Sequence, residues 1–266
     1  MFYAGIDVGS TTTKAVIIEA DHENIINRIV GRKVIKTGHN HSDSARMCLE
    51  GALDQADVAF SDILNIVGTG YGRNNIPFAG GKSTEIFCHA AGAKFYYPNA
   101  TTIIDIGGQD SKVIKMGNTG KVYDFSMNEK CAAGTGRFIE VICHVLGLDI
   151  KEAGKLSMNA SKELSISSMC TVFAESEVIS KIANGDSRED ILRALNNAIA
   201  DRVISMGKRI GIATDIVMTG GVARNIGIRK SFEKKLESEV FVPDDPQTVG
   251  ALGAAIKACE DYWKMN

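Results

Sequence analysis

The strongest constraint on how this chain folds is a short sequence pattern that occurs twice. Residues 6–14 read IDVGSTTTK, and residues 104–112 read IDIGGQDSK, 98 positions further on. In both copies apolar residues lead into an aspartate and then a glycine, which is typical of a buried strand that ends in a tight loop. Two copies in register indicate two similar halves that face one phosphate ligand. The matched pairs are Asp7 and Asp105, Gly9 and Gly107, Ser10 and Gly108, Lys14 and Lys112, and Val16 and Ile114.

Length and composition fit an ordinary globular protein. The 266 residues allow one large or two small domains, and 44% of them are apolar. A net charge of -2 argues against a nucleic-acid or anionic-membrane partner. No apolar stretch approaches the roughly 18 residues of a spanning helix, so we expect a cytoplasmic protein with no membrane partner. The six cysteines form no C-x-x-C pair, and we therefore expect neither disulfides nor a self-contained four-thiolate site.

Hydrophobic periodicity and the positions of Gly and Pro predict alternating strands and helices. A flexible loop is expected at 68–72. Strands are predicted at 2–8, 13–19, 63–67, 102–105, 113–116, 122–127, 215–218 and 240–242. Helices are predicted at 43–59 with Ser42 or Asp43 as its cap, at 83–96, 137–146, 172–183, 188 to about 210 with Ser187 as its cap, 226–239, and from about 249 onward.

Three of the predicted loops have the residues of a nucleotide site. The two Asp-x-Gly loops offer backbone N–H groups to phosphate oxygens, and Asp7 and Asp105 are placed to hold Mg2+ through water molecules. The third loop, at Gly220-Gly221, follows a strand and precedes a helix, so its bare backbone suits a flat base and ribose. A plain strand-ending turn is the alternative for each loop alone, and the three together favour the nucleotide site.

The three loops resemble the two phosphate motifs and the adenosine motif of the actin, sugar-kinase and heat-shock-chaperone ATPase fold. The resemblance implies an α/β protein with two related βββαβα domains and ATP in the cleft between them. By it, residues 1–100 with 247–266 form one subdomain, residues 101–246 form the other, and residues 250–255 belong to a helix that crosses at the hinge. By analogy only, Glu85 positions the attacking water and Gln109 reaches the γ-phosphate. The implied ATP-binding residues are Gly9, Ser10, Thr11, Thr12, Lys14, Gly107, Gly108, Gln109, Gly220, Gly221, Ala223 and Asn225.

Two cysteines stand at similar places in the sequence. Cys131 and Cys170 lie 39 residues apart, each shortly before a predicted helix. A helix N-terminus stabilises a thiolate or an anionic iron–sulfur centre. Two thiolates cannot hold a [4Fe-4S] cluster, but a twofold dimer would supply four. From the spacing alone, the simpler interpretation is that all six cysteines are small buried apolar residues.

A second resemblance favours a shared cluster over the interpretation that all six cysteines are buried apolar residues. Residues 128–138, 170–177, 70–74 and 104–110 are similar to segments of the activators of 2-hydroxyglutaryl-CoA dehydratase, and the similarity runs end to end. These activators and the ATPase subunits of benzoyl-CoA reductase are iron–sulfur ATPases. The resemblance implies that Cys131 and Cys170 of two subunits share one [4Fe-4S] cluster in a homodimer. It also implies that a ferredoxin or flavodoxin loads one electron, which ATP hydrolysis drives onto a 2-hydroxyacyl-CoA dehydratase.

Two other functions stay open at this point. A small-molecule kinase of the same fold would need a substrate pocket, and no sugar-binding insertion is visible in the sequence. An actin-like filament or interaction protein would have no reason for two cysteines at paired helix starts. Lys14 and Lys112 could meet phosphate or only solvate the strand ends.

Overall fold

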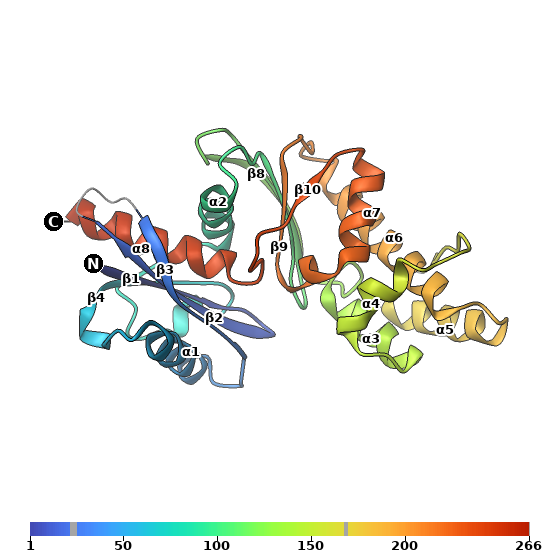
Figure 1. The fold of residues 1–266 in the computed structure, drawn as a ribbon, viewed down its shortest axis with the longest axis horizontal. Coiled ribbons are helices and arrows are strands. Elements are labelled where there is room, and N and C mark those ends of the chain that lie inside the picture. Colours follow the sequence, from blue (N-terminus) through green and yellow to red (C-terminus); the bar gives the residue numbers. More distant parts are fainter. Residues whose placement is uncertain (22–25, 168–169, 266) are drawn as a thin grey trace. The chain divides into compact units, whose positions relative to one another are not determined.

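The computed structural model describes residues 1–21, 26–167 and 170–265, and these form two compact units (Figure 1). Unit 1 consists of Met1–Asn99, Asn118–Val122 and Gln247–Asn266, and unit 2 consists of Ala100–Gly117 and Tyr123–Pro246. Within the described ranges, no helix combines the length and the apolar character needed to cross a membrane.

Unit 1 is a five-stranded mixed sheet with helices on both faces. The strand order is β3-β2-β1-β4-β5; β1 is antiparallel to β2 and parallel to β4. The strands are β1 (Phe2–Val8), β2 (Thr12–Ala20), β3 (Ile26–Lys36), β4 (Ile63–Thr69) and β5 (Gly81–Lys82), and the helices are α1 (His41–Ala56), α2 (Glu85–Tyr96) and α8 (Val249–Met265).

Helices cover both faces of this sheet. Alternate residues of each strand point to opposite faces, so one strand contributes to two apolar clusters. On β1, Ala4 and Ile6 pack in the cluster that includes α1, whereas Tyr3 packs in the cluster that includes α8. Helix α8 lies very close to α2, since a Cβ added at Gly253 would come within 1.7 Å of the Cys88 carbonyl oxygen. The helix predicted from about residue 249 is therefore confirmed, and it packs within unit 1.

Unit 2 repeats the sheet and adds helices between its third and fourth strands. The strand order β8-β7-β6-β9-β10 matches that of unit 1, with β6 antiparallel to β7 and parallel to β9. The strands are β6 (Thr102–Ile106), β7 (Ser111–Met116), β8 (Val122–Asn128), β9 (Ile216–Thr219) and β10 (Val240–Phe241), and the helices are α3 (Gly136–Leu146), α4 (Ile150–Ser157), α5 (Thr171–Ala183), α6 (Arg188–Gly207) and α7 (Ile226–Leu236).

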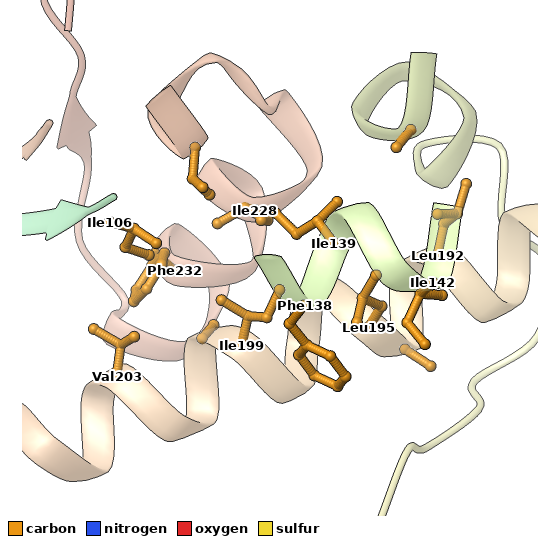
Figure 2. Close-up of a cluster of buried hydrophobic side chains, with 14 of the residues drawn as sticks. Ile106, Phe138, Ile139, Ile142, Leu192, Leu195, Ile199, Val203, Ile228 and Phe232 are labelled. Carbon is orange, nitrogen blue, oxygen red and sulfur yellow. The ribbon is translucent and has the colours of Figure 1, made fainter. Parts of the chain in front are cut away.

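The core of unit 2 joins the sheet to α3, α6 and α7 (Figure 2). Phe232 of α7 packs beside Ile106 at the end of β6, and both side chains are completely buried. Phe138 and Ile139 come from the first turn of α3 and pack against α6. The N-terminus of α3 is thus held by apolar packing near the loop that follows β6.

Several predicted element ends are wrong by a few residues. Helix α1 is capped by Asn40, whose Oδ1 accepts the N–H of Ser42 and of Asp43, and it ends at Ala56 because Asp57 adopts a left-handed conformation with φ 54°. The other shortened helices are α2, which begins at Glu85, α6, which ends at Gly207, and α7, which ends at Leu236. Gly68 and Thr69, expected in a flexible loop, are the last residues of β4.

Three elements are absent from the sequence prediction: strands β3 and β5 and helix α4. Strand β3 is an edge strand whose exposed positions carry charged residues, so its apolar alternation is weak. Helix α4 has only eight residues and is capped by Asp149, which accepts the N–H of Lys151 at 2.9 Å. Ser168 and Met169, in the segment expected to lead into α5, lie outside the described residues.

Candidate functional site

The first Asp-x-Gly loop is a tight hairpin between β1 and β2. Asp7 lies directly opposite Lys14 in the antiparallel register, and Lys14 Nζ contacts Asp7 Oδ2 at 2.9 Å. The Gly9 N–H donates to the Thr12 carbonyl at 3.1 Å and closes the turn. Ser10 is exposed at its tip and Thr11 is half-buried. Lys14 is therefore the ion-pair partner of the aspartate.

The second loop has the same geometry with more contacts. Asp105 faces Lys112 across β6 and β7, the nitrogen-to-oxygen distance is 3.2 Å, and Gly107 N–H closes the turn on Asp110 O at 3.0 Å. Lys112 also pairs with the Asp110 carboxylate. Thr219 of β9 donates its hydroxyl hydrogen to Asp105 Oδ1 at 2.8 Å. Both oxygens of the Asp105 carboxylate thus have partners.

A further pair of matching residues was missed by the sequence prediction. Thr69 lies beside Asp7 in the β1–β4 register, and Thr219 lies beside Asp105 in the β6–β9 register. Each is followed by a glycine with positive φ, 84° at Gly70 and 85° at Gly220. A Cβ at Gly70 would come within 2.3 Å of Asp7 Oδ1, so a bare backbone is needed there. The sequence does contain two matching Thr-Gly dipeptides, Thr69-Gly70 and Thr219-Gly220. They are 150 positions apart, whereas the two Asp-x-Gly motifs are 98 positions apart, so one constant offset does not align both features.

The N-terminus of α3 docks onto the second loop. Gly136 N–H donates to Gly107 O at 2.9 Å, and Arg137 N–H donates to Gly108 O at 2.8 Å. These bonds satisfy two of the four N–H groups that a helix leaves open at its start. These two N–H groups point to the hairpin, and stabilisation of a thiolate or cluster at Cys131 by the start of α3 stays a prediction.

The predicted adenosine loop is a short turn that leads into α7. Residues Gly221–Arg224 form a 3-10 turn, and Gly220 N–H donates to Pro246 O at 2.9 Å. Asn225 caps α7 through its Oδ1, which accepts the Ile228 N–H at 3.2 Å. Its Nδ2 is buried and has no hydrogen-bond acceptor among the described residues. Such an orphaned donor fits a ligand that brings its own acceptor.

The remaining predicted residues are Gln109, Glu85 and Ala223. Gln109 is exposed at the tip of the second hairpin, and Glu85 is the half-buried first residue of α2. Ala223 is 4% exposed, so its backbone is the part that a ligand would reach. Asp7, Thr12 and Glu85 belong to unit 1, and Asp105, Gln109 and the adenosine loop belong to unit 2.

Cys131 lies in a loop that a single side chain organises. Asn128 Nδ2 donates to the carbonyl oxygens of Cys131 at 2.7 Å and Ala133 at 3.1 Å. Its Oδ1 accepts the Cys131 N–H at 3.2 Å. The thiol-bearing residue is half-buried and precedes α3 by five positions.

Cys170 is the N-cap residue of α5 and is exposed. Its side chain makes no capping hydrogen bond to the first N–H groups of the helix. The positive end of a helix dipole favours an anion bound at such a position. Helices α3 and α5 pack together within unit 2.

The other four cysteines are buried, with at most 2% of each exposed. Burial raises the pKa of the Cys48 thiol to about 12 and that of the Cys88 and Cys143 thiols to about 11. Burial also raises the pKa of Cys259. Among the described residues, the accessible thiols are therefore Cys131 and Cys170, and no group of three or more His, Cys, Asp or Glu side chains is arranged to hold a metal.

Comparison with known proteins assigns this arrangement to a family. Residues 4–258 match the model of the BadF/BadG/BcrA/BcrD ATPase family. The chain belongs to this family. The match includes both hairpins, the adenosine loop, and the cysteines at 131 and 170.

Characterised relatives match over almost their whole length. The (R)-2-hydroxyglutaryl-CoA dehydratase activating ATPase of Acidaminococcus fermentans is 43% identical over 97% of this chain and 97% of its own. The solved structure of the activator of the 2-hydroxyisocaproyl-CoA dehydratase from Clostridium difficile with bound ADPNP superposes with a TM-score of 0.93. It is 44% identical and covers 100% of this chain and 97% of its own. The resemblance to dehydratase activators is confirmed.

The wider fold is also confirmed. A ROK family glucokinase from Streptomyces griseus, in complex with glucose and AMPPNP, shares the fold with a TM-score of 0.59 at 15% identity, over 98% of this chain and 100% of its own. This likeness shows the sugar-kinase type of α/β fold. In this chain the β3-β2-β1-β4-β5 order of unit 1 recurs in unit 2 as β8-β7-β6-β9-β10.

Proposed function

We propose that this chain is an ATP-dependent activator of a 2-hydroxyacyl-CoA dehydratase, to which it passes one electron from a ferredoxin or flavodoxin. The ATPase family and the activators among its relatives support this role. In this proposal, residues 1–100 with 247–266 and residues 101–246 are the two ATPase subdomains, and each contributes one Asp-x-Gly hairpin to the binding of MgATP.

The observation that carries the proposal is the docking of α3 on the second hairpin. Gly107 and Gly108 each accept an N–H from the first residues of α3, and the Cys131 loop lies immediately before that helix. A shift of the hairpin during ATP hydrolysis would therefore displace the start of α3 and the loop that bears the thiol. A plain small-molecule kinase has no need of this connection.

The hairpins suit a hydrated magnesium ion. Lys14 and Lys112 each occupy one oxygen of their aspartate, at 2.9 and 3.2 Å. A cation bound through water fits these carboxylates better than one that must displace a lysine, and Mg2+ commonly keeps several of its waters. In the proposal, Gly9, Ser10, Thr11, Thr12, Gly107, Gly108 and Gln109 contact the phosphates, Gly220, Gly221, Ala223 and Asn225 hold the adenosine, and Glu85 positions the attacking water.

The two accessible cysteines suit a shared iron–sulfur cluster. Cys131 and Cys170 would each supply a thiolate, and four ligands then require two chains. A bound [4Fe-4S] cluster supplies a site that gains and loses one electron. Asn128 holds the Cys131 backbone in place, and the start of α5 stabilises negative charge beside Cys170.

The surface of α5 supports a homodimer. Three large apolar side chains next to Cys170 or on the following turns are strongly exposed: Val172 at 67%, Phe173 at 69% and Ile179 at 53%. A row of exposed apolar residues on one helix marks an interaction surface. A second copy of the chain would cover it while bringing its own pair of cysteines.

Anaerobic purification tests the proposal directly. We expect about four irons per dimer, and ATP-dependent activation of a 2-hydroxyacyl-CoA dehydratase in the presence of a reduced ferredoxin. Cys131→Ser and Cys170→Ser should each abolish the iron and the activation, whereas Cys48→Ser and Cys259→Ser should retain both. About four irons on a monomer, or none on a fresh dimer, would contradict the shared cluster. Transfer of the ATP γ-phosphate to a sugar or hydroxy acid would favour a kinase.

A further inference from the structure

Unit 2 contains a cavity of about 390 Å³ that the proposed function does not use. The end of β8, the backbone at Ala133 and Gly134, and one face of α6 line it. None of the proposed nucleotide-binding residues lies on its walls. The cavity is therefore separate from the two hairpins and the adenosine loop.

The charged groups of this cavity favour an anion. Arg202 of α6 and Arg209 in the turn after it both line the wall, and neither forms an ion pair or hydrogen bond with any described residue. Arg202 is half-buried, which makes an unpaired charge costly. The carboxylate of Asp201 also lines the cavity, but it already pairs with Lys235 at 2.8 Å.

The shape of the wall leaves the arginines available to a ligand. Gly134 has a φ of 87°, and a Cβ there would lie 3.0 Å from Arg202 Cγ, so the bare glycine makes room for the arginine stem. Ser205 adds a hydroxyl between the two arginines, and Phe138 and Met206 add apolar surface. Guanidinium groups bind phosphate oxygens through paired N–H donors.

The two arginines favour an anion with more than one charged group. Arg202 lies in the last turns of α6 and Arg209 in the turn after it, so the wall carries two guanidinium groups; a diphosphate offers each a phosphate, whereas a single carboxylate is one charged group. We propose that this cavity binds a small phosphate-bearing molecule, with a diphosphate group between Arg202 and Arg209, and that its occupancy stabilises the loop that bears Cys131.

The link to that loop is direct. Asn128 and Ala133 line the cavity, and Asn128 makes the three hydrogen bonds that hold the Cys131 backbone and the Ala133 carbonyl. A ligand that contacts this wall restricts the same backbone. The site is thus suited to regulation of the thiol loop by a phosphate compound other than the ATP bound at the hairpins.

Calorimetric titration with inorganic pyrophosphate tests the site. The anaerobically prepared protein is first saturated with Mg2+ and ADPNP, which fills the phosphate positions of the nucleotide site. We expect saturable pyrophosphate binding that Arg202→Gln/Arg209→Gln weakens at least tenfold. Glutamine keeps most of the arginine stem, and unchanged ADPNP binding shows that the variant is folded. Arg209→Gln alone, a change at an exposed residue, should weaken binding severalfold.

A matched control variant distinguishes pyrophosphate binding in this cavity from non-specific attraction of pyrophosphate to positively charged side chains. Arg188→Gln/Lys208→Gln removes the same charge from exposed positions of α6 and its C-cap, and it should bind pyrophosphate like the wild type. No saturable binding to the wild type, or equal weakening in both double variants, would overturn the site. Hydrogen exchange of residues 128–136 should slow when pyrophosphate binds, and unchanged exchange would overturn the link to the Cys131 loop. Neither outcome depends on dehydratase activation.

Discussion

The two Asp-x-Gly hairpins have the same backbone design but different surroundings. In unit 1, Lys14 is the one side chain among the described residues that pairs with Asp7, and the Asp7 and Lys14 side chains are 9% and 14% exposed. In unit 2, Asp105 and Lys112 are 4% and 2% exposed, and Asp110 and Thr219 join them. Position 12 of the first hairpin, which matches Asp110, is a threonine.

The difference indicates a division of roles. Two carboxylates against one lysine leave the second hairpin with a net negative charge, whereas the first pair is neutral. A buried pair that loses one partner leaves an uncompensated charge, and a more exposed pair does not to the same degree. The second hairpin therefore has both the charge that attracts a divalent cation and the contacts that fix its own geometry.

The largest expected effect is on ATP turnover. Asp7→Asn and Asp105→Asn should each lower ATP hydrolysis by about a thousandfold, the upper range for loss of one preorganised polar contact to a developing charge. Circular dichroism should show both variants folded, with Asp105→Asn the less stable because Lys112 loses a partner. Hydrolysis by Asp105→Asn at the wild-type rate would show that the second hairpin is wrongly assigned.

Replacing the lysine of each hairpin should lower the free energy of unfolding by different amounts. Lys112→Met leaves Asp105 and Asp110 facing each other and should lower the free energy of unfolding by about 3 kcal/mol. Lys14→Met should cost about 1 kcal/mol, since that pair is more exposed. Urea unfolding in the absence of nucleotide measures both. Equal losses would mean that the additional carboxylate has no energetic role.

The additional carboxylate should affect metal binding. Asp110→Asn removes the net negative charge of the second hairpin, and we expect about a tenfold higher Mg2+ concentration for half-maximal ATP hydrolysis, or about 1.4 kcal/mol. Thr12→Asp, at the matching place in unit 1, is the complementary variant and should lower that concentration. An unchanged Mg2+ requirement in Asp110→Asn would place the metal away from this hairpin.

The last comparison concerns the two threonines. Thr219→Val removes a hydrogen bond to Asp105 and should cost about 1.5 kcal/mol of unfolding free energy. The hydroxyl of Thr69 is buried without such a partner, so Thr69→Val should be nearly neutral. Thermal unfolding of the two variants provides the comparison. A larger loss for Thr69→Val would show that the first hairpin has a contact equivalent to that of Thr219.

The repeated hairpins were predictable because their signal is local. An apolar run, an aspartate and a glycine lie within a few residues, and strand alternation determines which side chains face each other across the turn. The Asp7–Lys14 and Asp105–Lys112 ion pairs were not predicted, because the sequence left both lysines either to phosphate or to the solvated strand ends. The exact ends of α1 and α6 could not be predicted from this local pattern, because they depend on single residues such as Asp57 and on packing at each terminus.

The sequence by itself determined the duplicated strand–loop–strand units, the α/β class and the resemblance to dehydratase activators. Only the tertiary structure decided which residues complete each loop. Thr219 reaches Asp105 because β9 pairs in parallel with β6 across more than a hundred residues. The start of α3 docks on Gly107 and Gly108, and burial divides the six cysteines into two accessible thiols and four with raised pKa values. Contacts between distant segments arise from packing of whole elements, which no local residue pattern specifies.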